Sequence, residues 1–584
     1  IGRMTKNSFP GRDYRVGIQG ESKWYGQPLY DRPLGAQSEE TDDGRPVVWI
    51  TDFSACTPQE HWSDAPEPGL WQVIDFATDA FEGNLLYAEN TNPAPDVTLE
   101  LNLSGWYAVY LWMMGADGGL PKDTPDYNCV YSQSPGPALK LTSDRRFHHM
   151  FRTLTQVYMK APGLEGGFWR YADMTDQSLT IRHQDGTVYL AAIQAVPLAP
   201  AEVEAVVRDR NDPSRKRLII KGDSYTEQEC ERTVELLRDR GVGGWIIGNE
   251  NSPDLFHPGG SRRIAAFKRA CQEIEAECYV CDRPTLWSGF ESDPWDDARA
   301  KWYTEHPDFH CKEKDGTDNY CCSYAVPEVV DFMLDRVRAS VSPGPDGFGY
   351  FFNRDPHGLV RFEPAAIAGF EEKHGVDPLT LSDRDERLIE WRMDIITRFL
   401  RRVRETLDSV AEENGFARIK MIHVVLGNEA ANRYACLDVP RWVQEGLVDI
   451  LCPYPFADCA EWWLAQGHIE TDVAYFASLV KDTPCKLVPM WLSNRHRISW
   501  VREHVRTNEY FTKAIRDYAA GADGLTSWDQ VGLDAVFNAD RWLRLGDKER
   551  LAEWAEEDVP IPPFQRLTRL DGNTMKRFPA ASGG

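Results

Sequence analysis

The sequence has no apolar run of the roughly 20 residues that a membrane-spanning helix requires. Its first residues, 1–17, also lack the apolar core of a secretory signal peptide. We therefore expect a cytoplasmic protein with no membrane partner. A leader removed from the chain would give the same sequence and is the alternative.

The loops that mark several enzyme classes are absent as well. The sequence contains neither Gly-x-Gly-x-x-Gly nor Gly-x-x-x-x-Gly-Lys, which would cradle a nucleotide phosphate. It has no Gly-x-Ser-x-Gly turn for a serine nucleophile. No His-x-His follows the first predicted strand, as a metal-dependent amidohydrolase barrel requires. These absences argue against all three classes, and we expect no cofactor.

The 13 cysteines, an odd number, stand mostly on apolar segments. This pattern predicts reduced, buried thiols and no disulfide framework. Two clusters raise the question of a metal, Cys278 with Cys281 and His310-Cys311 with Cys321-Cys322. The first lies on an alternating strand, where residues three apart face opposite sides and cannot chelate one ion. The second either closes a zinc site or packs a loop, and we expect packing and no metal.

The chain carries 91 acidic and 65 basic residues, a formal net charge of −26. Such a field repels nucleic acid and anionic membranes, so neither is an expected partner. Arg354, Arg433, Arg495 and Arg497 nevertheless fall near predicted strand ends. They would suit an anionic or uronic sugar, or they pair with the many carboxylates. The composition leaves open whether the chain forms a homo-oligomer.

The stretch 346–357, Asp-Gly-Phe-Gly-Tyr-Phe-Phe-Asn-Arg-Asp-Pro-His, is the most informative in the chain. A turn opens it, a short apolar run without helical period follows, and a polar tip ends it. Strands that are apolar on both faces belong to parallel sheets covered by helices. In a barrel of such strands the chemistry takes place where the strands end. Arg354 and Asp355 would then face a cleft; a salt bridge between the two is the alternative.

The same pattern, a short apolar run closed by polar residues, recurs between 217 and 529. Helical stretches separate most of the runs. In 383–413, apolar residues keep spacings of three and four, from a predicted N-cap at Ser382 to a stop at Asn414-Gly415. Eight such units in roughly 310 residues is the size of a (β/α)8 barrel, so we predict an α/β protein built on a TIM barrel. The predicted strands are 217–223, 244–251, 277–284, 346–352, 419–429, 448–456, 486–494 and 523–529.

At 584 residues the chain is too long for one core, so at least two domains are expected. Before residue 205, alternating strands and turn residues replace helical periodicity. We predict that residues 1–205 form an all-β, jelly-roll-like sandwich. Carbohydrate binding is one role that such a domain could have. The catalytic barrel then spans 206–545. The extension 546–584 packs on the barrel or on the sandwich.

Several segments resemble a known family. His306-Pro-Asp-Phe, Asp315-Gly and Ser323-Tyr-Ala-Val-Pro-Glu-Val-Val are similar to a loop and helix of bacterial family-10-type glycosyl-hydrolase-like proteins. In that family they precede the fourth strand of a (β/α)8 barrel. The resemblance covers roughly 217–530 and implies this fold, with carbohydrate chemistry at the strand ends. The segments similar to the family's fourth, sixth and eighth strands are 346–356, 442–449 and 521–529.

The sequence departs from the family within the fourth strand. The family commonly has an aspartate where this chain has Phe351, so Asp355 cannot simply inherit that role. A barrel that binds saccharide without cleaving it therefore stays open. Other glycosidase clans use an Asn-Glu pair at strand four and a glutamate at strand seven. Here Asn249-Glu250 and Asn428-Glu429 follow strands two and five, which disfavours those clans.

Glycoside hydrolysis needs two carboxyl groups across the scissile bond, one protonated as the acid and one ionised as nucleophile or base. The best-placed pair is Glu429 after strand five and Asp355 after strand four. Glu429 follows an apolar run whose burial would keep it protonated, and Arg354 would keep Asp355 ionised. Each carboxylate could instead cap a helix or pair with an arginine. The substitutes are Asp223, Glu250, Asp282, Glu363 and Asp529.

Sugar rings offer apolar faces, so sugar sites combine aromatic platforms with hydrogen-bonding groups. Aromatic residues stand at or just after several predicted strands. The sequence thus predicts a glycoside hydrolase acting on an oligo- or polysaccharide. The alternatives are a non-catalytic saccharide-binding barrel and a lyase or epimerase acting on a uronic sugar. The predicted substrate-binding residues are Arg354, Asn353, Asn428, Asp223, Tyr225, Glu250, Asp282, Glu363, Tyr454, Trp491, Trp528 and Asp529.

Overall fold

The fold is that of a computed structural model. The residues it describes are 40–41, 43–64, 67–78, 80–89, 92–114, 137–143, 163–183, 188–222, 237, 241–248, 258–285, 287, 297–353, 358–455, 471–492, 507–528, 544–556 and 564–570.

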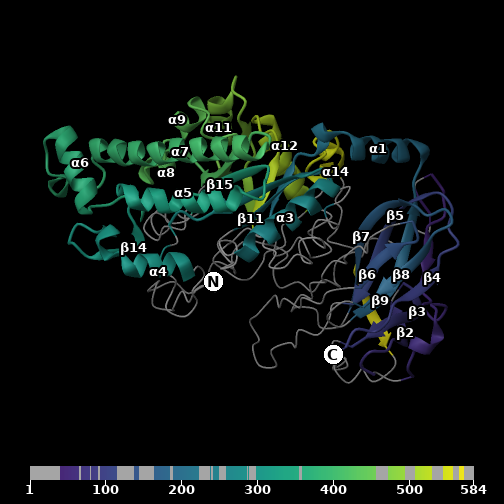
Figure 1. Ribbon diagram of the computed structural model, residues 1–584. Coiled ribbons are helices and arrows are strands. Elements are labelled where there is room, and N and C mark those ends of the chain that lie inside the picture. The colour runs from purple at the N-terminus through teal and green to yellow at the C-terminus, as the bar shows by residue number, and fades with distance from the viewer. Residues whose placement is uncertain are drawn as a thin grey trace, which may run out of the picture.

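A parallel sheet forms the centre of the larger part of the chain (Figure 1). β18 and β19 are separated only by Val488 and Pro489; β18 pairs with β17, whereas β19 pairs with β20. The segment 486–492 therefore joins the two ends of the sheet, and the sheet curls. Each of the eight predicted strands overlaps an observed one, an arrangement consistent with a TIM barrel. In spatial order the strands are β18 (Lys486–Leu487), β17 (Ile450–Tyr454), β16 (Lys420–Leu426), β15 (Gly347–Phe351), β12 (Glu277–Asp282), β11 (Val242–Gly248), β10 (Leu218–Lys221), β20 (Leu525–Trp528) and β19 (Met490–Leu492).

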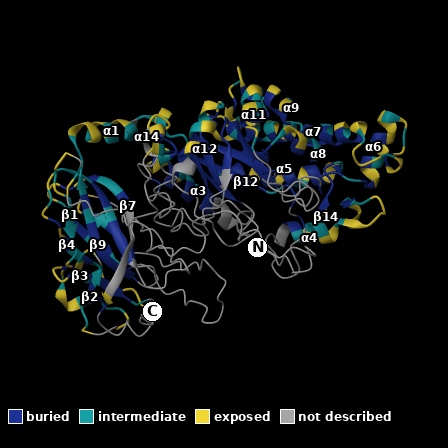
Figure 2. Ribbon diagram, turned by 180° about the vertical axis from the view of Figure 1, so that it is seen from behind, coloured by how far each residue is buried: buried dark blue, intermediate teal, exposed yellow. Residues whose placement is uncertain are grey.

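The strands are apolar on both faces because each face is buried. In β10, Leu218 and Ile220 pack outward against helices, whereas Ile219 packs inside the curled sheet. Gly349 permits a close approach of β15 to β16, since a Cβ added there would lie 1.4 Å from the Ile422 carbonyl oxygen. Figure 2 shows buried residues where this sheet lies and exposed residues on the outer faces of the helices. The inner side chains include aromatic and aliphatic residues from most of the strands, as in a filled barrel core.

Helices cover the outer face of the sheet. They are α3 (Pro258–Glu273), α5 (Pro327–Val341), α7 (Glu386–Asn414), α8 (Glu429–Tyr434), α9 (Val439–Gln444), α11 (Val473–Val480), α12 (Thr507–Ala519) and α14 (Leu551–Glu556). Additional elements gather at the end of the molecule away from the antiparallel sheets (Figure 1). They are α4 (Asp297–Glu305), α6 (Pro364–His374) and the hairpin of β13 (His310–Lys312) and β14 (Asp318–Cys322). Single turns of 3-10 helix are η2 (Gln59–His61), η3 (Pro213–Arg215), η5 (Pro307–Phe309) and η7 (Pro378–Thr380).

The long helix α7 runs beside α5 against β15 (Figure 1). Its N-cap is Asp385, which accepts a hydrogen bond from the Arg387 N–H, and not Ser382 as the sequence predicted. Ser382 instead accepts from the Arg384 N–H and closes the preceding turn. The predicted stop is confirmed, because Gly415 ends the helix in the left-handed conformation with φ of 68°.

Aspartates fix the register of the parallel sheet at the ends where strands begin. Asp346, just before β15, accepts from the Cys278 N–H of β12 at 2.9 Å. Asp449, before β17, accepts from the Met421 N–H of β16 at 2.7 Å. Asp523, before β20, accepts from the Leu487 N–H at 2.8 Å. Three strands thus begin with the same carboxylate-to-backbone contact, a stabilising device away from the strand ends that carry chemistry.

Two antiparallel sheets form the other part of the molecule. The three-stranded sheet shares one buried core with β3, β5 and β9 of the larger sheet. β5 pairs with both β7 and β9, so the larger sheet closes on itself. The larger sheet consists of β1 (Val48–Ile50), β9 (Val188–Pro197), β3 (Glu82–Ala88), β2 (Gln72–Thr78), β21 (Phe564–Leu570), β7 (Gly163–Asp173) and β5 (Trp106–Met114); the smaller of β4 (Val97–Glu100), β8 (Ser178–Arg182) and β6 (Ala138–Leu141).

A strand from the last part of the described chain joins strands of the first 200 residues in the larger antiparallel sheet. β21 lies between β2 and β7, although residues 198–563 separate it from the end of β9. α1 (Pro200–Asn211) leads from β9 toward the parallel sheet, and its Arg210 donates to the Tyr171 carbonyl at 2.7 Å. Where the chain returns from the parallel sheet toward β21, Glu549 accepts two hydrogen bonds of 3.0 Å from the guanidinium of Arg217, the residue before β10. The parallel part is therefore inserted between two strands of one antiparallel sheet.

Among the residues that the structure describes, no helix is long and apolar enough to cross a membrane.

His423 provides a pH-dependent test of the packing between β16 and the helices. The imidazole is fully buried beside Phe352 and Trp442, and its Nδ1 accepts from the Tyr350 N–H at 3.2 Å. Burial lowers the pKa of His423 to about 3. The unfolded chain takes up this proton near pH 6.5, whereas the folded chain does not, so stability is complete above that pH and falls as the pH drops toward 3.

We expect His423 to account for a loss of about 2 kcal/mol in the free energy of unfolding between pH 8 and pH 5. His423→Gln keeps an acceptor for the Tyr350 N–H but cannot titrate, so this part of the pH dependence should disappear. Urea unfolding of both proteins at the two pH values measures the difference. An equal loss in the variant and the original chain would show that His423 is protonated in the folded state.

Candidate functional site

The C-terminal ends of the parallel strands bring a lysine into the interior of the sheet. Lys221 is the last residue of β10 and follows the inward phase of Ile219. It is 1% exposed, and its Nζ lies 5.9 Å from the ring centroid of Phe351, the last residue of β15. Sequence reasoning missed Lys221, although a lysine that closes an apolar run was visible in Arg-Leu-Ile-Ile-Lys-Gly-Asp.

Asn353 follows Phe351 by two residues, in the turn after β15. Its side chain is fully buried, and neither the amide oxygen nor the amide nitrogen has a hydrogen-bond partner among the residues that the structure describes. Burying a polar group without a hydrogen bond costs about 1–3 kcal/mol, so this amide is suited to a ligand. Tyr454, the last residue of β17, is also buried in the inner cluster. We call Lys221, Phe351, Asn353 and Tyr454 the floor residues.

Asn428 and Glu429 follow β16 but leave the interior. The Asn428 side chain accepts from the Ala431 N–H at 2.8 Å and caps α8. Glu429 is the first residue of that helix and is exposed. At this position the helix dipole stabilises a negatively charged carboxylate. The burial that the sequence analysis expected for Glu429 is absent, because the apolar run ends at Leu426 and the chain turns outward before residue 429.

Asp282 lies on the outer side of the sheet. It shares the phase of Cys278 and Val280, which pack against helices. Its carboxylate forms a buried ion pair with Arg299 of α4 and accepts from the Arg283 N–H at 2.8 Å. Both side chains are nearly inaccessible, at 4% and 1% exposure. The structure thus places Asp282 in an ion pair that anchors α4 at this strand tip, and its contact with a substrate stays a prediction.

Glu363 is fully buried just before α6. It accepts from the Ser323 hydroxyl and from the Arg361 N–H at 3.1 Å. Burial raises the pKa of Glu363 above its usual range. A protonated carboxyl is what a general acid requires, but a fully buried group cannot reach a substrate. The structure therefore gives Glu363 a role in joining α6 to the segment after β14.

The remaining predicted site residues cannot be placed. Asp223, Tyr225, Glu250, Arg354, Asp355 and Asp529 lie outside the described residues. Trp491 and Trp528 have their backbone in β19 and β20, and their side chains lie outside the described set.

The cysteine and histidine cluster in the β13–β14 hairpin consists of packing contacts. Cys311 donates to the Gly358 carbonyl and Cys321 to the Thr285 carbonyl, each at 3.0 Å. Both nitrogens of His310 have partners, the Tyr303 carbonyl at 2.8 Å and Asp318 at 3.1 Å. Within the described ranges, no three histidine, cysteine or acidic side chains are placed to hold a metal. Burial raises the pKa of the Cys322 thiol to about 12, which keeps it protonated.

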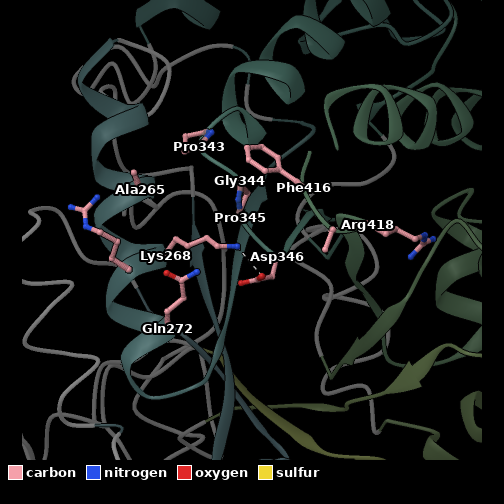
Figure 3. A pocket seen from close by; sticks show the side chains of 11 residues that line it. Ala265, Lys268, Gln272, Pro343, Gly344, Pro345, Asp346, Phe416 and Arg418 are labelled. Atoms are coloured by element: carbon pink, nitrogen blue, oxygen red, sulfur yellow. Dashed lines mark hydrogen bonds and ion pairs between the residues drawn. The ribbon is translucent and has the colours of Figure 1, made fainter. Parts of the chain in front are cut away.

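A cavity of about 320 Å³ opens at the opposite end of the sheet, beside the last turns of α3 (Figure 3). Lys268 points at Asp346 and pairs with it at 2.9 Å, and Asp346 holds the register contact described above. Arg418 pairs with Asp449, a second register aspartate. Basic residues near the C-terminus of a helix also complement its dipole. These contacts stabilise the sheet and leave the floor residues as the candidate site.

Comparison with known proteins gives likeness to solved structures alone, since no family model and no curated protein matches the chain. It is similar to a β-galactosidase from the psychrophilic Marinomonas ef1, with 12% identity over 59% of this chain and 61% of that one and a TM-score of 0.43. It is similar to the PgaB (BpsB) glycoside hydrolase domain from Bordetella bronchiseptica, with 13% identity over 57% and 98% and a TM-score of 0.41. It is also similar to the catalytic domain of a β-amylase from Paenibacillus polymyxa, with 10% identity over 58% of this chain and 98% of that one and a TM-score of 0.39. The chain spans about three fifths of the β-galactosidase, and none of these three names describes a family-10-type protein.

Proposed function

We propose that this chain is a glycoside hydrolase that cleaves an oligo- or polysaccharide at the C-terminal ends of the parallel strands. One observation carries the proposal: six of these strands are followed within four residues by a carboxylate. Because parallel strands end at one rim, we expect these carboxylates to surround the end of the sheet where the floor residues lie. The six are Asp223 after β10, Glu250 after β11, Asp355 after β15, Glu429 after β16, Asp458 after β17 and Asp529 after β20.

Glycoside hydrolysis of this kind requires at least two carboxyl groups. One must donate a proton to the leaving oxygen, and the other must attack the anomeric carbon or activate a water. The sequence-based pair, Asp355 as nucleophile or base and Glu429 as acid, is the first to test. Arg354 would hold Asp355 ionised. The exposed position of Glu429 makes Asp223, Glu250 and Asp529 the next candidates for the acid.

The rest of the proposal follows the sequence analysis. The barrel would span 206–545 and a jelly-roll-like sandwich 1–205, while the extension 546–584 contributes β21 to the larger antiparallel sheet. Neither a cofactor nor a metal is needed for two-carboxylate chemistry. The partner would be a carbohydrate, in the cytoplasm, and aromatic strand-end residues would stack on its rings. The proposed stacking residues are Tyr225, Tyr454, Trp491 and Trp528.

We expect Asp355→Asn to abolish hydrolysis of both natural glycosides and activated aryl glycosides. Glu429→Gln should slow natural substrates by about 100-fold or more and activated aryl glycosides much less, because their leaving groups need no proton. The assay is release of reducing ends from a polysaccharide panel and of phenol from aryl glycosides. Glu390→Gln, an exposed carboxylate on α7, is the matched control. Unchanged rates in both site variants would move the pair to other strand ends.

A second candidate function is saccharide binding without cleavage. Phe351 favours it, because a fully buried phenyl ring stands inside the sheet where the resembling family commonly has an aspartate. The same panel separates the two functions. Saccharide binding by calorimetry, with no reducing ends released from any substrate, would support the binding barrel and contradict the hydrolase.

A further inference from the structure

We propose that Arg392 binds a small monovalent anion, such as chloride, at the end of the parallel part where the strands finish. Arg392 lies in the second turn of α7. The connection from β15 to α6 brings Phe362 close to its guanidinium, and the connection from α8 to α9 brings Cys436. The inference goes beyond the proposed function, because it adds an ion site that two-carboxylate chemistry does not require.

The first argument is the charge of Arg392. The residue is 4% exposed, and an arginine keeps its proton even where burial lowers its pKa. An arginine is rarely buried to this extent without an anionic partner, because the charge loses its hydration. Arg299, which is similarly buried, has Asp282 as its partner. Arg392 forms no ion pair with any residue that the structure describes, and a bound anion would supply the opposite charge.

The second argument is the edge of the guanidinium that has no acceptor. Nη2 of Arg392 donates to the Arg361 carbonyl at 3.5 Å, a long contact. The guanidinium carbon lies 4.8 Å from the centroid of the Phe362 ring. Nε of Arg392 is buried and has no hydrogen-bond partner in the described part of the chain. Leaving a buried donor without an acceptor is costly, and an anion beside Nε would both accept this bond and balance the charge.

The ionised carboxylates nearest to Arg392 have other partners. Glu313 pairs with the guanidinium of Arg361. Asp383 pairs with Lys314 on the other side of the same region. Each of these two carboxylates therefore balances a different cation, and the charge of Arg392 remains to be balanced.

Two buried groups near Arg392 could supply a negative charge only by losing a proton. Burial raises the pKa of Glu363, whose carboxyl accepts from the Ser323 hydroxyl. Burial also raises the pKa of the Cys436 thiol, although Arg392 and Arg361 oppose this shift. Both groups thus favour the neutral form, and a bound ion is the better source of charge.

The surroundings favour an ion that is small and singly charged. One guanidinium carries one charge, which chloride balances, whereas a phosphate group brings close to two negative charges. Phe362 and the Arg361 carbonyl already contact the guanidinium, and the residue is almost inaccessible. These contacts favour a single ion over an anionic sugar with its carbon skeleton.

The experiment measures the linewidth of the chloride NMR signal while chloride replaces gluconate at constant ionic strength. We expect a protein-dependent broadening that saturates and that bromide or nitrate displaces, but sulfate does not. Chloride should also raise the midpoint of thermal unfolding by about 2 °C, since a ligand that binds the folded chain stabilises it. Arg392→Met should remove both effects. The control is Arg402→Met, which changes the net charge equally at a side chain that is 48% exposed on the same helix, and it should keep both effects.

Absence of saturable broadening in the original chain would overturn the inference, whether or not Arg392→Met folds. Broadening that survives in Arg392→Met would overturn it as well, because the ion would then bind elsewhere. Glu363→Gln tests the other source of charge and should leave chloride binding unchanged. Chloride binding that appears only in Glu363→Gln would show that an ionised Glu363 balances Arg392, and would contradict the inference. No saccharide is present in these measurements, so the proposed function stands or falls separately.

Discussion

Truncation of the chain after residue 560 is expected to unfold the antiparallel part of the molecule. The cut removes β21, which lies between β2 and β7 and completes a sheet that closes on itself. Two strand edges would lose their hydrogen-bond partners and become sites for aggregation. Leu570, 1% exposed beside Phe76, would leave the inner core as well. Loss of one buried leucine side chain alone costs about 2–5 kcal/mol, so loss of the whole strand should exceed the stability of this part.

Calorimetry and limited proteolysis measure this effect. The matched control is truncation after residue 573, which keeps β21 and should unfold like the full chain. Leu570→Asp in the full chain should reproduce much of the damage, because it buries a charge in the same core. A 560 truncation that keeps the full unfolding enthalpy and resists protease as the full chain does would show that β21 is dispensable.

The parallel sheet was predictable because its signal is local. A strand buried on both faces needs an uninterrupted apolar run, and the run must stop where the chain turns toward solvent. The segments 217–223 and 346–352 each show both features, the apolar run and its polar end, within a few residues. The helix α7 is equally local, with a regular apolar spacing and a glycine stop. Its N-cap was misplaced by three residues because Ser382 and Asp385 both have side chains that can accept a backbone N–H.

The strand β21 could not be recognised from the sequence for the opposite reason. Its seven residues, Phe-Gln-Arg-Leu-Thr-Arg-Leu, alternate weakly and follow a proline-rich stretch. Only its pairing with β2 and β7, almost the whole chain away, makes it a strand. Strand propensity depends on such neighbours, which no local window contains.

The candidate site was predicted less well than the fold, since a strand tip does not reveal which way its side chain points. Asp282 and Lys221 both end apolar runs, yet Asp282 pairs with Arg299 of α4, whereas Lys221 follows the inward phase of Ile219. The difference is one residue of phase, because successive side chains face opposite sides of a strand. Counting phase from buried aromatic residues would have separated them, and would have singled out Lys221. The contact of Glu363 with Ser323 depends on tertiary packing and has no local signal.

Arg299→Met is expected to destabilise the protein by about 3–5 kcal/mol, because it leaves the buried carboxylate of Asp282 without its cation. Arg299 also donates to the Arg283 carbonyl at 2.6 Å, so the variant loosens α4 from the end of β12. Asp282→Asn alone should lower the free energy of unfolding by roughly several kcal/mol, since it leaves the guanidinium of Arg299 buried beside a neutral side chain. Urea unfolding of the two single variants and the double variant forms a double-mutant cycle.

The double variant, Asp282→Asn with Arg299→Met, should recover most of the loss, because no buried charge is then left unpaired and the asparagine oxygen still accepts from the Arg283 N–H. This recovery separates the two roles considered for Asp282. An ion pair that only anchors α4 can be replaced by neutral side chains, and the stable double variant should then bind saccharide as the original chain does. A carboxylate that contacts the substrate cannot be replaced in this way. A double variant that regains stability but not saccharide binding would return Asp282 to the site.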